Sequence, residues 1–267
     1  MASPFQPEIG RVAFASASVV PLRKEASDAA EQVTQLLIGE SAEVLAHGAR
    51  DWVHVRCGHD GYEGWCDGKM LQSAAGFEPN YLLRAACTLV VWGDSGSRWL
   101  PAGGWLHSRE GQLFAPCGTP VRFEQPILDA GWRAWLGAPY QWGGRTALGV
   151  DCSGLMQVLA RVSQPDAFVD RDAADQIQLG RPIAFPDHTA GDWAFFHNPS
   201  GRVVHVGLLV AQGTILHAAG EVRLDQLTAE GIVRTLPDGS TLRTHALTGI
   251  RRHAWSLAAD RSNGEQR

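Results

Sequence analysis

Hydrophobic and polar residues alternate in short runs through the first part of the chain, and glycine-rich turns separate the runs. Such alternation is typical of half-buried strands, and several short strands at regular spacing are typical of a small barrel. Three of these runs are VAFASASVVPLR, QVTQLLIGES and DWVHVRC, and the turn GHDGYEG follows the last of them. The pattern therefore predicts a β-barrel over about residues 10–72.

The spacing of tryptophans predicts a second, shorter barrel in the region that follows. Trp105 follows Trp92 at the same spacing as Trp65 follows Trp52, and a glycine precedes the second tryptophan of each pair. The proline-bearing segment GFEPN, which separates the two regions, has the composition of a linker. We therefore expect a shortened copy of the first barrel over residues 76–124.

From about residue 125 the apolar residues follow a different pattern. In PILDAGWRAWLG they recur at helical spacing, and Pro126 suits the start of a helix. A second helical pattern begins at Cys152, whose neighbours Asp151 and Ser153 are typical of helix starts. We expect a short helix at RDAADQ and three strands at GDWAFF, RVVHVGLLV and TILHAAG. We therefore expect helices followed by strands in the region after the two barrels.

Length and composition agree with this division and exclude two classes of partner. The chain has 267 residues, 45% of them hydrophobic, which suffices for more than one core. Its formal net charge is -5 and it has no basic cluster, so we expect no nucleic-acid partner. No apolar run is long enough for a membrane helix, so we expect no membrane insertion. The expected domains are a barrel at 1–75, a shortened barrel at 76–124, a third domain at 125–257 and a polar tail at 258–267.

The N-terminal residues and the cysteines favour a reducing compartment. The first residues lack the basic start and apolar run of a secretory signal, so we expect a cytoplasmic protein. Five cysteines are an odd number, which argues against a disulfide framework. No Cys-x-x-Cys pair occurs, so we expect no metal site. Four cysteines are expected to be small buried hydrophobic residues: Cys57, Cys66, Cys87 and Cys117.

Cys152 is the exception, because its position at a helix start makes it a candidate nucleophile. The positive end of a helix dipole stabilises a thiolate and lowers the pKa of the thiol. A cysteine nucleophile needs a base, and the base needs an orienting partner. His205 and His217 lie in successive expected strands, so antiparallel pairing can place their imidazoles side by side. Either histidine alone would be interpreted as a hydrogen-bonded core residue, but the three residues together favour a Cys–His–His site.

The segment YQWGGRTALGVDCSGL, followed by RDAADQ, GDWAFF, HVGLLV and ILHAAG, resembles the NlpC/P60 family of cysteine peptidases over about residues 125–255. The resemblance implies a papain-like α+β fold and cleavage of peptidoglycan stem peptides, with no metal or organic cofactor. It implies that Cys152 is the nucleophile, His205 the base and His217 the orienting residue. Tyr140 matches a family tyrosine that lies beside the cysteine and supports the oxyanion or the substrate.

The first barrel resembles bacterial SH3 (SH3b) domains in the order of its motifs, from Val-x-Leu-Arg to Gly-Tyr-x-Gly-Trp. SH3b domains before an NlpC/P60 domain resemble the γ-D-glutamyl-L-diamino acid endopeptidases. These enzymes cut between D-Glu and the diamino acid of stem peptides whose N-terminal L-Ala is free. A free ammonium needs carboxylate and hydroxyl partners, which a blocked N-terminus would leave unpaired. The resemblance implies that Asp151, Ser153, Glu31 and Tyr62 contact the amine, and Glu40 is the alternative to Glu31. It implies that Arg171 and Asp172 contact the diamino acid and that Trp142 forms a wall of the cleft.

Several alternatives stay open at this point. Glu31 and Glu40 also suit a solvated surface, Trp142 also suits a core, and Arg171 with Asp172 also suits an ion pair at a helix start. Position 173 is Ala where many relatives have a small hydroxyl residue. The same catalytic residues suit an amidase or acyltransferase, and a non-enzymatic wall-binding protein is a third interpretation. Diaminopimelate and lysine both remain candidates for the diamino acid, and the oligomeric state is open.

Overall fold

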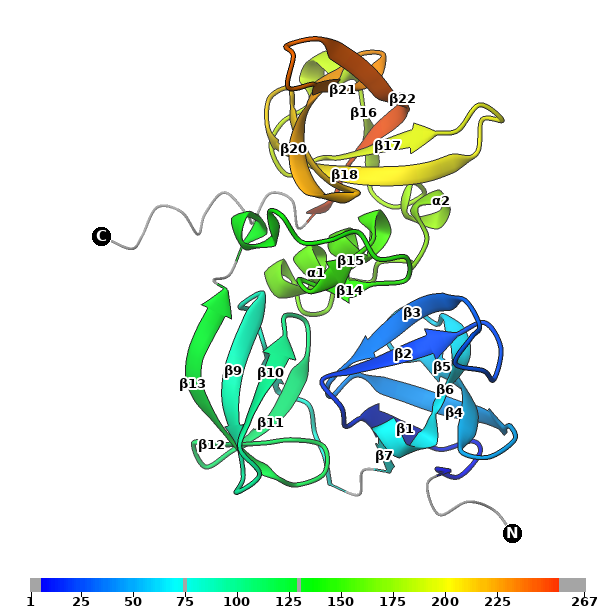
Figure 1. The fold of residues 1–267 in the computed structure, drawn as a ribbon, viewed down its shortest axis with the longest axis vertical. Coiled ribbons are helices and arrows are strands. Elements are labelled where there is room, and N and C mark those ends of the chain that lie inside the picture. Colours follow the sequence, from blue (N-terminus) through cyan, green and yellow to red (C-terminus); the bar gives the residue numbers. More distant parts are fainter. Residues whose placement is uncertain (1–5, 74–75, 129–130, 255–267) are drawn as a thin grey trace. The chain divides into compact units, whose positions relative to one another are not determined.

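The computed structural model describes residues 6–73, 76–128 and 131–254 and divides the chain into two compact units (Figure 1). Unit 1 comprises Met1–Ala134 and Gln141–Ala147, and unit 2 comprises Trp135–Tyr140 and Leu148–Arg267. The predicted polar tail at 258–267 lies outside the described residues, and the predicted domain boundaries stay predictions.

The first sheet of unit 1 is the predicted N-terminal barrel. Its seven strands lie in the order β3-β2-β6-β5-β4-β1-β7. In β5 burial alternates as the sequence pattern predicts, and the side chains of Val53, Val55 and Cys57 point into the core. The elements are β1 (Val12–Ala15), β2 (Val19–Arg23), β3 (Gln32–Leu37), β4 (Ser41–His47), β5 (Trp52–Cys57), β6 (Glu63–Asp67), the 3-10 helix η1 (Gly68–Met70) and β7 (Leu71–Ser73).

The second sheet of unit 1 has six strands in the order β10-β9-β13-β12-β11-β8. Its core contains Trp92, Leu100 and Leu106 together with Ile38, which follows β3 of the first barrel. The backbone N–H of Trp105 donates to the Ile38 carbonyl at 2.7 Å, so the two barrels share both packing and a hydrogen bond. The strands are β8 (Tyr81–Leu82), β9 (Cys87–Trp92), β10 (Ser97–Pro101), β11 (Trp105–Arg109), β12 (Gln112–Phe114) and β13 (Pro120–Leu128), and β14 (Arg145–Thr146) lies in the second segment of the unit.

The predicted helix over PILDAGWRAWLG is wrong in its first part. β13 pairs antiparallel with β9 from Val121 opposite Trp92 to Leu128 opposite Cys87, and among the described residues of this segment only the 3-10 helix η2 (Trp132–Trp135) is helical. Pairing with β9 satisfies a full row of backbone groups, and this outweighs the helical spacing of a few apolar residues. Pro126 adjoins a register shift, where a missing N–H disturbs the ladder least.

Unit 2 combines a closed sheet with a buried helix, as expected for an α+β domain. Its seven strands lie in the order β16-β22-β17-β18-β19-β20-β21, and additional pairing of β22 with β21 closes the sheet into a barrel. Helix α1 packs against β18 and β19 (Figure 1). The elements are β15 (Gly149–Val150), α1 (Cys152–Ser163), α2 (Ala173–Gln176), β16 (Arg181–Ile183), η3 (Phe185–Asp187), β17 (Trp193–His197), β18 (Val203–Ala211), β19 (Thr214–Ala219), β20 (Glu221–Thr228), β21 (Gly231–Thr235) and β22 (Thr241–Arg252).

The helix predicted to begin at Cys152 and the three predicted strands are therefore confirmed as α1, β17, β18 and β19. All five cysteines are free. Three of the four expected core cysteines are buried, but Cys117 is exposed, so that expectation is wrong for this residue. Across the described part of the chain, no helix combines the length and apolar character required to cross a membrane.

Candidate active site

The start of helix α1 positions Cys152 in the core of unit 2. Asp151 is the N-cap residue, and its Oδ1 accepts the backbone N–H of Gly154 at 2.7 Å. Cys152 is therefore the first helical residue, and its side chain is buried. The backbone N–H groups of Val206 and Ser153 both form hydrogen bonds with the Cys152 side chain. Since Val206 directly follows His205, strand β18 brings the predicted base to the nucleophile.

The two predicted histidines belong to a longer chain of hydrogen bonds. Nε2 of His205 lies 2.9 Å from Nδ1 of His217. Nε2 of His217 lies 2.9 Å from Oδ2 of Asp225, which also accepts the Nε–H of Arg223 at 2.9 Å. Burial opposes the charge on Asp225, but hydrogen bonds from His217 and Arg223 outweigh it and lower the pKa of this carboxyl. Asp225 is thus an ionised acceptor at the end of the chain.

This chain of bonds fixes the tautomer of the base. An ionised carboxylate only accepts, so Nε2 of His217 carries a proton and its Nδ1 accepts. His205 then donates from Nε2 to that Nδ1. The lone pair of His205 is left on Nδ1, which is the atom available to take a proton from a thiol.

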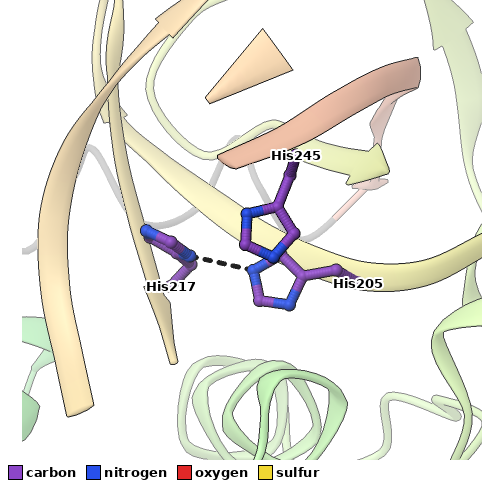
Figure 2. A group of neighbouring side chains, drawn as sticks. All are labelled: His205, His217 and His245. Carbon is purple, nitrogen blue, oxygen red and sulfur yellow. Dashed lines mark hydrogen bonds between the residues drawn. The ribbon is translucent and has the colours of Figure 1, made fainter. Parts of the chain in front are cut away.

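A third imidazole adjoins the pair, which the sequence analysis missed. The ring of His245, on β22, stacks on the ring of His205 at a centroid distance of 4.2 Å and an angle of 22° (Figure 2). Nδ1 of His245 lies 2.9 Å from Oγ1 of Thr244. His205, His217 and His245 each offer a nitrogen atom, and these atoms lie within 4.8 Å of one another, so the group could hold a metal ion.

Cys152 and His205 are both neutral in this environment. Burial, followed by the Asp151 carboxylate, raises the pKa of Cys152 to about 12, despite the opposing N–H groups and Arg171. Burial and the neighbouring imidazoles of His217 and His245 hold the pKa of His205 well below its ordinary value. The expectation that the helix dipole gives a low thiol pKa is therefore wrong for this structure, because desolvation is the larger effect.

We accordingly expect alkylation of Cys152 by iodoacetamide to accelerate throughout the range from pH 6 to pH 9. Only the thiolate reacts, and its fraction grows about tenfold per pH unit below the thiol pKa. Peptide mass spectrometry gives the rate at Cys152, with the exposed Cys117 as an internal measure of reagent activity. A rate at Cys152 that is already constant below pH 7 would instead reveal a preformed thiolate–imidazolium pair.

Tyr140 lies close enough to the nucleophile to interact with it electrostatically. Burial, followed by electrostatic interactions with Cys152 and Asp151, raises the pKa of the Tyr140 hydroxyl. The backbone N–H of Tyr140 donates to the Gly220 carbonyl at 2.9 Å, which holds the residue against the end of β19. A phenol that stays protonated is a hydrogen-bond donor, as its predicted role beside the oxyanion requires.

Asp151, Ser153 and Arg171 form a buried network rather than three separate contacts. Nη1 of Arg171 donates to Oδ1 of Asp151 at 3.1 Å and to Oγ of Ser153 at 2.8 Å. Its Nη2 donates to Oδ2 of Asp151, and all three side chains are buried. Arg171 therefore pairs with Asp151, whereas Asp172 is the N-cap residue of α2. Substrate contacts by these four residues stay predictions.

The remaining predicted contacts lie in unit 1, where the structure separates the two candidate glutamates. Oε1 of Glu31 accepts the indole N–H of Trp142 at 2.8 Å, and Trp142 is 58% exposed, so it is no core residue. Glu40 is only 2% exposed and forms a salt bridge with Arg145 at 2.7 Å, so it is not a surface carboxylate. Tyr62 lies in the turn before β6, where its backbone N–H donates to Oδ1 of Asp60 at 3.0 Å.

A second group that could hold a metal lies in unit 1. Cys57, His59 and Asp60 each offer one donor atom within 4.8 Å of the others. Neither this group nor His245 and Asp225 was predicted from the sequence. The signal for Asp225 was its place in the alternating run VRLDQL beside the strand of His217, whereas nothing local marks His245.

Comparisons with known proteins agree with this geometry. The NlpC/P60 family matches residues 137–236, and the bacterial dipeptidyl-peptidase Sh3 domain matches residues 22–71. The chain is 40% identical over 86 residues to a gamma-D-glutamyl-L-lysine dipeptidyl-peptidase of Bacillus subtilis, covering 32% of this chain and 28% of that protein. It is 33% identical over 107 residues to the probable endopeptidase NlpC of Escherichia coli, covering 40% of this chain and 64% of that protein.

The chain thus spans less than two thirds of the length of either curated relative. Among solved structures, an NlpC/P60 family protein from Bacillus cereus has a TM-score of 0.73 at 20% identity, covering 91% of this chain and 99% of that one. This likeness confirms the predicted fold class, a papain-like α+β domain preceded by SH3-type barrel structure. Residues 137–236 of the chain thus match the NlpC/P60 family, and residues 22–71, which precede them, match the bacterial dipeptidyl-peptidase Sh3 domain.

Proposed function

We propose that the chain is a cysteine peptidase that hydrolyses the γ-D-glutamyl–diamino acid bond of peptidoglycan stem peptides with a free N-terminal L-Ala. The observation that carries the proposal is the hydrogen-bonded chain Asp225–His217–His205. This chain leaves Nδ1 of His205 unprotonated, and the next residue, Val206, forms a hydrogen bond with the Cys152 side chain. As part of the same proposal, the enzyme acts in the cytoplasm on peptides recycled from the wall.

The reaction begins from a neutral thiol and a neutral imidazole. His205 takes the proton of Cys152 as Sγ attacks the γ-glutamyl carbonyl, so thiolate and imidazolium form together. The Cys152 backbone N–H and the Tyr140 hydroxyl donate to the developing oxyanion. His205 then protonates the leaving amine of the diamino acid, which leaves a thioester on Cys152. In the second half, His205 takes a proton from water, and the resulting attack releases L-Ala-D-Glu and restores the thiol.

Two observations support the substrate. The first is the dipeptidyl-peptidase type of the SH3 domain, which agrees with a B. subtilis relative named for γ-D-glutamyl-L-lysine. The second is the exposed pair of Glu31 and Trp142 in unit 1, because an exposed carboxylate suits an ammonium group. Glu40 does not compete for this role, because it is only 2% exposed and pairs with a buried arginine, whereas the Glu31 side chain is 46% exposed.

We expect the protein to release L-Ala-D-Glu from L-Ala-γ-D-Glu-diaminopimelate or its lysine counterpart, and to leave the N-acetylated forms intact. Acetylation removes the ammonium charge and leaves its carboxylate partner desolvated without a counter-charge. Mass spectrometry of each peptide after incubation identifies the bond that is cleaved and shows whether the free peptide is preferred over the acetylated one. Glu31→Gln should weaken cleavage of the free peptide, whereas Glu43→Gln, on the same barrel, should not. The two carboxylates are matched, since each is 46% exposed and pairs with a basic side chain.

Each result of this experiment separates one interpretation from another. Cleavage of free and acetylated peptides alike would support the peptidase activity but contradict the proposed binding of the free amine. Cleavage of neither, with Cys152 still reactive towards iodoacetamide, would favour an amidase or acyltransferase of other substrates.

A further inference from the structure

Three imidazoles from three strands meet at one point of unit 2. His205 lies on β18, His217 on β19 and His245 on β22, and their rings converge (Figure 2). One nitrogen of each lies within 4.8 Å of the others. The mechanism uses two of these rings, that of His205 as the base and that of His217 as its orienting residue. The third has no place in the mechanism, although its ring lies against the base.

We propose that His205, His217 and His245 form a site for a divalent transition-metal ion of the zinc class, and that the bound ion switches the enzyme off. Neutral imidazole is a preferred ligand of such ions, with metal–nitrogen bonds of about 2.0–2.1 Å. Tetrahedral geometry then places ligand nitrogens about 3.4 Å apart. The 2.9 Å separation of His205 and His217 must therefore open by about half an ångström, and the His245 ring, which stacks on His205 at 22°, must rotate so that its nitrogen lone pair points at the ion. Water would complete the tetrahedron.

The surroundings of two of the rings match those of metal ligands. Histidine ligands commonly bond through their second ring nitrogen to a carboxylate or another polar group, which fixes the ring. His217 bonds Asp225 through Nε2, and His245 bonds the Thr244 hydroxyl through Nδ1. Nδ1 of His217 and Nε2 of His245 are thereby left as the ligand atoms.

Inhibition follows from the tautomer of His205. An ion bound at Nε2 displaces the proton from that nitrogen, and the neutral ring then carries its proton on Nδ1. Nδ1 is the atom that must accept the proton of Cys152, so a metal-bound His205 is no base. This consequence rests on the proposed function, whereas binding of the metal does not.

Titration of the full chain with Co²⁺ tests binding without any peptidase assay. Visible absorption of bound Co²⁺ reports the site, and its loss on addition of Zn²⁺ shows that both ions share it. His245→Phe keeps an aromatic ring against His205 but removes one ligand atom. The matched control is His197→Phe, because His197 is also half-buried and also bonds a threonine hydroxyl through Nδ1, at 2.9 Å from Thr248.

We expect one equivalent of Co²⁺ to bind to the unsubstituted chain and to His197→Phe, and the affinity to fall at least about tenfold in His245→Phe. Cys152→Ala should still bind Co²⁺, because the thiol is not a ligand. Equal affinity in His245→Phe and His197→Phe would overturn the proposal. Loss of Co²⁺ binding in Cys152→Ala would also overturn the proposal, since the Cys152 thiolate would then be a ligand of the ion.

The activity arm uses the free tripeptide. Zn²⁺ should inhibit the unsubstituted chain and His197→Phe at the same concentration, and His245→Phe should need at least about tenfold more. Cobalt binding with no turnover in the absence of metal would refute the proposed function and leave the site standing. Turnover that Zn²⁺ does not inhibit, despite cobalt binding, would refute the switch.

Discussion

Replacement of Cys152 by alanine is expected to lower kcat for the tripeptide by at least about 10⁴-fold, without unfolding the protein. The alanine side chain has no atom that can form the thioester, and oxyanion donors without a nucleophile retain only a small part of the rate enhancement. Alanine fits at the start of α1, because the N-cap bond from Asp151 to Gly154 does not involve the sulfur. The loss of one buried sulfur atom should cost only about 1 kcal/mol of stability.

Single-turnover hydrolysis and a thermal melt measure the two halves of this expectation. Cys87→Ala is the matched control, because Cys87 is also a buried free cysteine but belongs to unit 1. It should lose a similar amount of stability and no activity. Turnover by Cys152→Ala within tenfold of the unsubstituted chain would remove Cys152 from its role as nucleophile.

The parts of the site that could be predicted from the sequence are those whose positions depend only on nearby residues in the chain. Cys152 follows a glycine-rich turn and opens an apolar helix, and His205 and His217 lie in successive strands joined by a tight turn. Neighbouring antiparallel strands bring such residues together without knowledge of the rest of the fold. Asp225 lies on the next strand of the same meander. Its contact with His217 could be predicted only from the strand register, in which Arg223 pairs with His217.

His245 could not be placed in this way. Its strand, β22, closes the sheet by pairing with β21 and also pairs with β17, and both ladders contain register shifts. A shift of one residue turns a side chain to the opposite face of a sheet. Only the folded barrel therefore shows that His245 points to the catalytic pair.

Long-range interactions also overturned two local inferences. The apolar spacing of PILDAGWRAWLG favours a helix, but β9 recruits part of that segment as a strand. The helix N-terminus favours a thiolate at Cys152, but burial beneath β18 favours the neutral thiol. In both cases the local preference is weaker than the effect of distant residues that pack against the segment.

Replacement of Glu40 by alanine is expected to lower the free energy of unfolding by about 3–5 kcal/mol. Glu40 and Arg145 are 2% and 0% exposed, and they form a two-pronged salt bridge with N–O distances of 2.7 and 3.0 Å. The alanine variant retains the buried guanidinium but loses its carboxylate, and an uncompensated charge in a core is far costlier than a lost surface pair. Oε2 of Glu40 also accepts the backbone N–H of Leu37 at 2.8 Å, so a second bond is lost.

Urea unfolding followed by circular dichroism measures this loss, with Glu63→Ala as the matched control. Glu63 pairs with Arg56 at 2.8 Å on the same barrel, but the two side chains are 41% and 47% exposed, so its removal should cost less than about 1 kcal/mol. The double variant Glu40→Leu with Arg145→Met should regain much of the stability, because it removes both buried charges and fills their space with apolar groups. If Glu40→Ala were no more destabilised than Glu63→Ala, the pair would contribute no more than a surface contact, and Glu40 would return as a candidate for the substrate amine. A large loss that the double variant repairs would establish that Glu40 holds Arg145, and with it the segment Gln141–Ala147, on the first barrel.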